Sequence, residues 1–132
     1  MLMPSLALAV VQVSEMDDIS IGTWSGTGSI TVSDQICVYN SAGKDFYIRG
    51  RTTTGSFVFS DGSHSFPFRL IADGINLDYN ADLKLANADT SSPTCDGHPN
   101  VNLEVFISEA NLSGATAGSG YQAVISVIIA PL

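Results

Sequence analysis

The most regular feature of the chain is an alternation of apolar and polar side chains with a period of two residues. It is clearest in residues 75–85 and 101–107, where apolar residues take every second position. Successive side chains of a β-strand point to opposite faces, so this pattern predicts strands with one buried and one solvated face. Strands are expected over residues 19–24, 29–39, 45–51, 56–60, 64–72, 75–85, 101–108 and 121–130.

Turn-forming residues separate these segments, as in Asp61-Gly62 and Asp73-Gly74. No segment holds a helical period over three turns. About eight short strands in one chain are typical of an all-β sandwich or barrel. The 132 residues fit a single domain that is large enough to bury a hydrophobic core.

The last predicted strand, residues 121–130, differs from the others because it is apolar on both faces. Such a strand belongs inside a sheet, or beside an added strand that pairs with its free edge. The sequence ends at Leu132, so we expect no later segment to cover it. We expect one face of this strand to line an acceptor groove, with the side chains of Tyr121, Ala123, Ile125, Val127 and Ile129.

Near the other end, residues 5–13 form an apolar stretch with no turn that ties it to a neighbouring strand. Extended, these residues span about 30 Å, enough for one full strand. Two alternating sets compete for its inward face, and a bulge near Val10-Val11 would let both contribute. The residues expected to fill the groove are Leu6, Leu8, Val10, Val11 and Val13.

The same segment also has a feature of a secretion signal. Ala7-Leu8-Ala9 has the small-x-small form of a signal-peptidase site, but residues 1–6 carry no basic residue and are short for a signal peptide. Either the sequence begins inside a signal sequence, or these residues belong to the mature protein. If cleavage follows Ala9, the donor strand would instead be residues 10–16.

The net charge of the chain limits the classes of partner that it can bind. Five Lys and Arg residues stand against thirteen Asp and Glu residues, which gives a net charge of −8. This charge repels phosphate backbones, so we expect no nucleic-acid partner. No uninterrupted apolar run is long enough to cross a bilayer as a helix, so we expect no integral membrane segment.

The two cysteines, Cys37 and Cys95, are far apart in the sequence and have no neighbouring Cys or His at zinc-ligand spacing. We expect a disulfide between them. The chain-entropy model gives such a bond on the order of 4 kcal/mol, and an oxidising compartment such as a periplasm or the cell exterior would maintain it. The alternative is two buried free thiols in a cytosolic domain.

Candidate chemistry is sparse, and we expect no enzyme, catalytic residue, metal or cofactor. His64 near Asp61 could suggest a Ser/His/Asp group, but a surface histidine at a hairpin is the favoured interpretation. The segment 95–98 is interpreted as a disulfide plus a turn rather than a metal site. Trp24 could stack on a sugar, although an anchor that packs on the core is favoured.

Several short motifs follow one another through most of the chain. They are ISIGTWSGTG at 19–28, CVYNS at 37–41, FRL at 68–70, LDY at 77–79, Cys95, NLEV at 102–105, Leu112, Ala117-Gly118, Gly120-Tyr121 and Ala130-Pro131. In their order and spacing these motifs resemble the spore coat protein U domain family, which is found in subunits of archaic chaperone-usher pili.

The resemblance implies an incomplete immunoglobulin-like β-sandwich that a donor strand from a neighbouring subunit completes. Residues 1–16 would be the donor strand and residues 17–132 the pilin-like domain. Such a subunit would pass through the periplasm to an extracellular pilus on a bacterial surface, in fibres that serve cell adhesion and biofilm formation. Its partners would be identical or related subunits, a periplasmic chaperone and an outer-membrane usher.

One alternative keeps the same strands but changes the function. In a self-contained secreted β-sandwich, residues 5–13 would fold back onto their own domain, and Trp24, Tyr39 or Tyr47 would stack on carbohydrate. A small hydrolase is a weaker alternative, because neither cysteine and neither histidine has an evident catalytic partner in the sequence.

Overall fold

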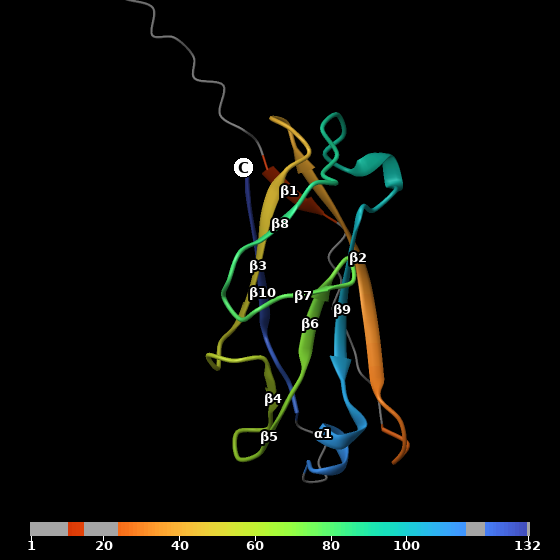
Figure 1. Ribbon diagram of the computed structural model, residues 1–132, viewed down its shortest axis with the longest axis vertical. Helices are drawn as coiled ribbons and strands as arrows, with labels where there is room; N and C mark the ends of the chain where they lie inside the picture. The colour runs from red at the N-terminus through yellow and green to blue at the C-terminus, as the bar shows by residue number, and fades with distance from the viewer. Residues whose placement is uncertain (1–10, 15–23, 116–120, 132) are drawn as a thin grey trace, which may run out of the picture.

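The computed structural model describes residues 11–14, 24–115 and 121–131 (Figure 1). Its elements are β1 (Val11–Ser14), β2 (Ile30–Asn40), β3 (Phe46–Thr52), β4 (Val58–Ser60), β5 (Ser65–Pro67), β6 (Arg69–Ala72), β7 (Ile75–Asn76), β8 (Leu83–Leu85), the 3₁₀ turn η1 (Cys95–Gly97), β9 (Val101–Ile107), α1 (Glu109–Ser113) and β10 (Ile125–Pro131).

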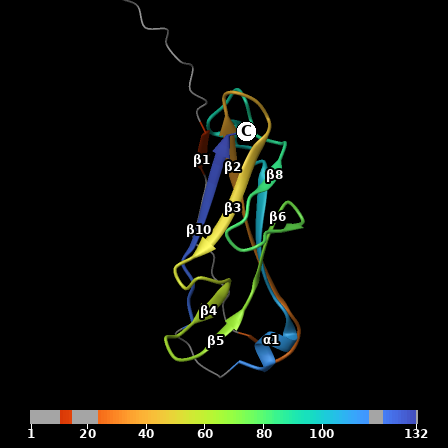
Figure 2. The ribbon, with the colours of Figure 1, turned by 60° about the vertical axis from the view of Figure 1, so that its left-hand side comes forward.

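The strands form antiparallel sheets, which confirms the all-β prediction. The larger sheet has the order β1-β2-β9-β6-β7, the second has the order β10-β3-β8, and β4 and β5 form a hairpin. Figures 1 and 2 show the two main sheets as layers that run along the long axis of the molecule. Among the described residues, no helix is long and apolar enough to cross a membrane.

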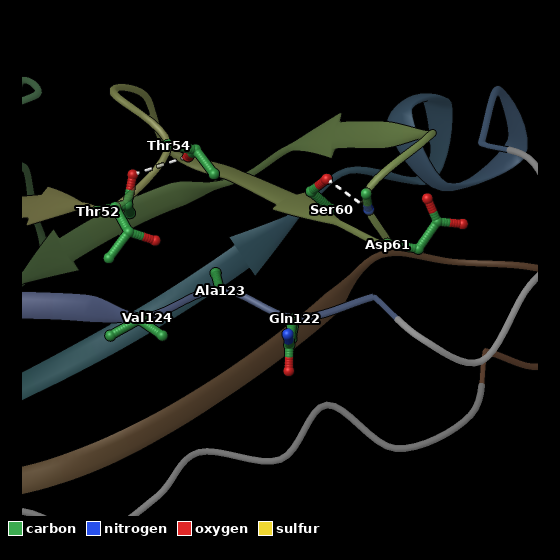
Figure 3. Close-up of a pocket in the computed structure, with 9 residues that line it drawn as sticks. Thr52, Thr54, Ser60, Asp61, Gln122, Ala123 and Val124 are labelled. Atoms are coloured by element: carbon green, nitrogen blue, oxygen red, sulfur yellow. Dashed lines mark hydrogen bonds between the residues drawn. The ribbon is translucent and has the colours of Figure 1, made fainter.

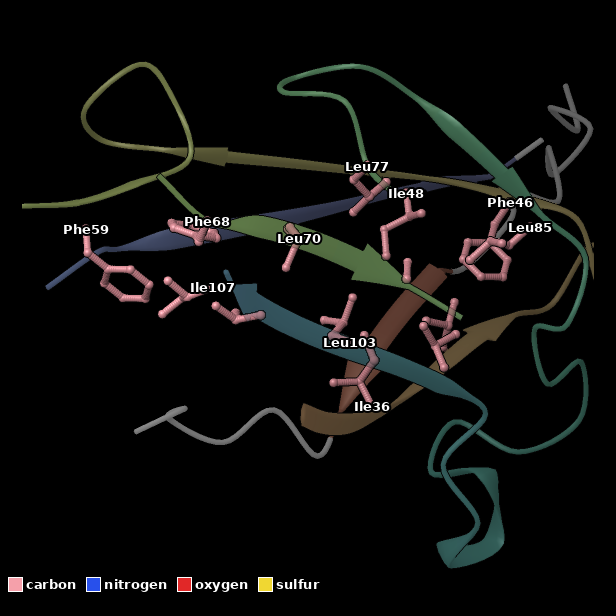
Figure 4. Packing of buried hydrophobic residues seen from close by; sticks show 14 of the residues in the cluster. Ile36, Phe46, Ile48, Phe59, Phe68, Leu70, Leu77, Leu85, Leu103 and Ile107 are labelled. Atoms are coloured by element: carbon pink, nitrogen blue, oxygen red, sulfur yellow. The ribbon is translucent and has the colours of Figure 1, made fainter. Parts of the chain in front are cut away.

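The hydrophobic core lies between these two sheets. Its members come from both layers and include Ile36, Phe46, Ile48, Leu70, Leu103 and Ile107 (Figure 4). Burial alternates strictly along β9, so the alternation predicted for residues 101–107 is confirmed. Burial of these side chains away from water is the main contribution that holds the layers together.

The single strand predicted over residues 75–85 is wrong. The structure has two short strands there, β7 and β8, with a loop between them that turns at Asn80, whose φ is +54°. The Tyr79 hydroxyl donates to the Thr52 carbonyl oxygen at 2.9 Å and accepts from the Thr52 N–H at 3.0 Å. The loop still buries Leu77. In this segment the period-two pattern therefore indicates which side chains are buried, although the segment does not form one continuous strand.

Two further predicted boundaries differ. The strand predicted over residues 64–72 is divided at Phe68, because β5 pairs with β4 and β6 pairs with β9. The Phe68 N–H still donates to the Phe57 carbonyl oxygen at 3.0 Å, next to the β4–β5 pairing. The short helix α1 was not predicted. It begins because the Ser108 side chain accepts a hydrogen bond from the Asn111 N–H, which satisfies a backbone donor at the helix start.

The predicted disulfide between Cys37 and Cys95 is confirmed, which overturns the alternative of two free thiols. Cys37 lies in β2 and is fully buried, while Cys95 begins the η1 turn. The bond therefore ties the long polar loop before β9 to the end of β2. The interpretation of residues 95–98 as a disulfide plus a turn is also confirmed.

Some predictions fall largely outside the described residues. Of the strand predicted over residues 19–24, the structure describes Trp24 alone. The proposed division into residues 1–16 and 17–132 stays a prediction.

Candidate functional site: the open edge of β10

Strand β10 has one paired edge and one open edge. It pairs with β3 along its whole length, from Ile125 opposite Thr52 to Pro131 opposite Phe46. Within the described part of the chain, no strand pairs with its other edge. An unpaired edge presents a row of backbone N–H and C=O groups that can accept another strand. We call this row of groups on residues 125–131 the open edge, and β1 lies beside part of it without pairing.

The side chains that point inward from this strand are only half-buried. They are the five predicted for an acceptor groove, namely Tyr121, Ala123, Ile125, Val127 and Ile129, and all pack against the core. By contrast, Ile36 and Ile48 on interior strands are fully buried. Solvent therefore reaches the core along β10. These five residues pack against the core from one face, and their acceptor role stays a proposal.

The opening continues onto β2. Ile30 and Val32 also point toward the core and are half-buried. This half of β2 pairs with β9 on one side, and no described strand pairs with its other side. Because β1 pairs with the far half of β2 and lies beside β10, the free edges of β2 and β10 border the same side of the molecule (Figure 2).

The predicted donor residues are divided between two regions. Val11 and Val13 lie in β1, which pairs antiparallel with β2 of the same molecule, Val11 opposite Asn40 and Val13 opposite Val38. Leu6, Leu8 and Val10 lie outside the described residues. For Val11 and Val13 this pairing agrees with the alternative in which residues 5–13 fold back onto their own domain, and not with the predicted place of these two residues in a neighbour's groove. The signal for it is the polar pair Gln12 and Ser14, which gives residues 11–14 the alternation of a half-buried strand.

The end of β2 that holds β1 is rigidly fixed from its other side. The Asn100 side chain accepts from the Val38 N–H at 2.8 Å and donates to the Val38 carbonyl oxygen at 2.9 Å. The Asp89 N–H also donates to the Val38 carbonyl oxygen at 2.9 Å. With the disulfide at Cys37, these contacts give β1 a preformed edge on which to pair.

A shallow pocket of about 290 Å³ lies where the chain enters β10 (Figure 3). Its lining residues are Thr52, Thr53, Thr54, Ser60, Asp61, Gly62, Gln122, Ala123 and Val124. Ser60 and Gln122 exchange two backbone hydrogen bonds of 3.0 Å, which fasten the β4–β5 hairpin to the start of β10. The hairpin thus fixes the position of the segment that leads into β10.

The Asp61 carboxylate in this pocket is engaged in its own turn. It accepts from the Ser63 N–H at 2.9 Å and from the His64 N–H at 2.6 Å. These backbone hydrogen bonds hold the pKa of Asp61 below its usual value. The His64 ring nitrogen Nδ1 lies 3.4 Å from the other carboxylate oxygen, and the ring is exposed, so the prediction of a surface histidine at a hairpin is confirmed.

Tyr121 lies at the start of the inward row. Its ring packs against Phe66 with a centroid distance of 4.9 Å. Burial is the main cause that raises its pKa, and the nearby Asp61 carboxylate raises the pKa further. A neutral tyrosine in this position joins the hairpin to the inward row of β10.

Trp24 contacts residues of its own domain. Its ring packs against the core, and its Nε1 donates to the Gly28 carbonyl oxygen at 2.9 Å. The Gly28 N–H in turn donates to the Glu109 carboxylate of α1. The prediction of a core anchor is confirmed. Among the described residues, no group of three or more His, Cys, Asp and Glu side chains could hold a metal ion.

No protein-family model matches the chain, and no curated protein matches it.

Proposed function

We propose that this protein is a structural subunit of an extracellular bacterial pilus, assembled through the chaperone-usher pathway by donor-strand exchange. The observation that supports the proposal best is the open edge of β10 above a half-buried apolar row. The disulfide between Cys37 and Cys95 fits passage through an oxidising periplasm. In this account, the fold is an incomplete immunoglobulin-like sandwich, as the resemblance to the spore coat protein U domain implies.

The pairing of β1 with β2 assigns different tasks to the two halves of the N-terminal segment. Residues 11–14 complete the protein's own larger sheet. The donor strand is then residues 1–10, and Leu6, Leu8 and Val10 form a single alternating set within it. Residues 5–10 span about 20 Å when extended, which is close to the length of the seven-residue strand β10.

A neighbour's donor strand would stabilise the subunit in two ways. It would supply backbone partners to the open edge, each contributing about 0.5–1.5 kcal/mol. It would also cover the inward row, with about 25 cal/mol for each Å² of apolar surface removed from water. Until a donor arrives, the same edge and row need a temporary occupant, which is the task of the periplasmic chaperone in this account.

Charged substitutions in the donor test this function. Leu8→Asp should abolish the heat-resistant ladders of multimers that a donor-strand polymer gives on a gel. Ala9→Asp adds the same charge at the neighbouring position, which points to the opposite face of an extended strand, and should leave the ladders largely intact. A wild-type protein that stays a stable monomer after release from its chaperone would refute the proposal and favour a self-contained carbohydrate-binding domain.

A further inference from the structure

The cations of this acidic protein are concentrated on one sheet face. Of its five Lys and Arg residues, Arg49, Arg51 and Lys84 lie on the outer face of the β10-β3-β8 sheet. Burial alternates along β3, so Tyr47, Arg49 and Arg51 point away from the core. Lys84 of β8 stands directly opposite Tyr47 in the ladder. We call these four side chains the cationic face.

Strand β10 adds exposed apolar surface to the same side. Ile128 is opposite Arg49 and Ser126 is opposite Arg51 in the ladder. The Ile128 side chain is 38% exposed, and Val124, which directly precedes the strand, is 59% exposed. The cationic face lies on the other side of the sheet from the inward row, so a donor strand on the open edge of β10 would leave it accessible.

These charges are available to a partner. Arg49 Nε lies 2.8 Å from an Asp82 carboxylate oxygen, and Lys84 Nζ lies 3.7 Å from one of Asp45. The four side chains of these two ion pairs are between 38% and 56% exposed. Exposed ion pairs of this kind contribute little to stability and exchange readily. In the part of the chain that the structure describes, Arg51 makes no ion pair. Three cations therefore face two carboxylates here, against a net charge of −8 for the whole chain.

We propose that the cationic face binds a carboxylate-bearing polysaccharide. Guanidinium groups match carboxylates in a two-pronged hydrogen-bonded geometry. Arg49 and Arg51 take alternate positions on one strand, which sets them about 7 Å apart along an extended ligand. Tyr47 continues the same row and offers an aromatic ring against which a sugar can pack.

Two other polyanions fit this surface less well. Nucleic acid carries a phosphate about every 1.7 Å of duplex, and the acidic body of the protein repels such a dense charge. Anionic membranes are bound by clusters of about 4–8 Lys and Arg residues, more than the three cations of this face. A polysaccharide with widely spaced carboxylates meets the local cations and avoids most of the repulsion.

Binding of the full chain to polygalacturonate tests the proposal, with neutral dextran, duplex DNA and anionic phospholipid vesicles as competing probes. We expect binding to polygalacturonate that weakens as salt rises from about 50 to 200 mM. The R49Q/R51Q variant should lose affinity about tenfold or more. The R69Q variant is the matched control for the single variant R51Q, because Arg69 lies on β6 in the other main sheet, and it should change affinity about twofold or less. The single variant R51Q removes no ion pair within the described residues and keeps the test valid if the double variant is unstable.

Several results would overturn the proposal. They are a lack of binding to polygalacturonate at about 50 mM salt, equal losses in the R51Q and R69Q variants, equal binding to dextran, and tighter binding to DNA or to vesicles. The test does not depend on polymerisation, because the ladder assay reads assembly separately. Wild-type protein that binds polygalacturonate without forming ladders would therefore contradict the pilus function alone.

Discussion

Gly50 of β3 lies directly against Leu70 of β6, and a Cβ atom added to Gly50 would come within 2.6 Å of Leu70 Cδ2. The same Cβ would approach the Phe57 ring at 3.3 Å. The two main sheets therefore meet at this point with room for a hydrogen atom and no more. Gly50 is opposite Val127 in the ladder, so its contact with Leu70 lies next to the inward row of β10.

Gly50→Ala should lower the free energy of unfolding by about 1–3 kcal/mol, because the added methyl group forces Leu70 or the sheets to move. Urea denaturation measures the change. Gly43→Ala is the matched control, because a Cβ at Gly43 meets nothing within 4 Å, and its effect should stay within about 0.5 kcal/mol. Equal effects of the two substitutions would contradict this account of the interface between the sheets.

Asn100→Ala should destabilise the protein by about 1–3 kcal/mol, because it leaves the buried Val38 N–H without the acceptor it has in the structure. The same substitution at Asn76, an exposed residue of β7, should change stability by about 0.5 kcal/mol or less. Hydrogen exchange at the Val38 amide would locate the effect. Unchanged protection of this amide in the Asn100→Ala variant would speak against the proposed fixation of β2.

Asp96→Gly should stabilise the protein by about 0.5–1 kcal/mol. Asp96 has a φ of +51° in the η1 turn, where a side chain is strained and glycine is not. Asp73 has a similar φ of +48°, but its carboxylate accepts hydrogen bonds from the Asn102 N–H and the Asn87 side chain. Asp73→Gly should therefore destabilise the protein, and thermal melts of both variants should move in opposite directions.

The Asp61 turn should make part of the stability depend on pH. Backbone hydrogen bonds lower the pKa of Asp61 in the folded protein, so its carboxylate stabilises the fold at neutral pH. This contribution is lost as the pH falls through the unfolded value of about 4 and then through the lower folded value. The stability difference between wild type and Asp61→Asn should therefore shrink in acid. Asp78→Asn provides the control for loss of an exposed charge, and a difference that grew in acid would contradict the assignment.

Sequence patterns predicted the parts of the fold in which burial and pairing coincide. In β9 every second residue is buried and the strand is paired along its length, so the alternation and the strand agree. The disulfide followed from the scarcity of cysteines. Residues 75–85 have the same alternation, yet the Tyr79 hydroxyl takes the backbone of Thr52 as its partner and the segment leaves the ladder.

Only part of the candidate site could be predicted, because a sequence pattern describes a single strand and not the strand that pairs with it. The inward set on β10 consists of every second residue of a single segment, which is local information. The division of the N-terminal segment at Val11 depends on which strand accepts it, and a period of two does not encode the identity of a partner. The cationic face was missed because Arg49, Arg51 and Lys84 come together through the register of β3 with β8.

The central claim is that residues before Val11 of one copy fill the open edge of β10 in another copy. Mixing two variants that each add one cysteine to the native disulfide pair tests it most directly, one with Leu8→Cys and the other with Ile125→Cys, Val127→Cys or Ile129→Cys. We predict oxidative cross-links between the two different chains for at least one of the three pairs, with Ala9→Cys in place of Leu8→Cys as the weakly linked control. Cross-links that form only when both cysteines are on the same polypeptide, or none with any pair, would contradict the claim.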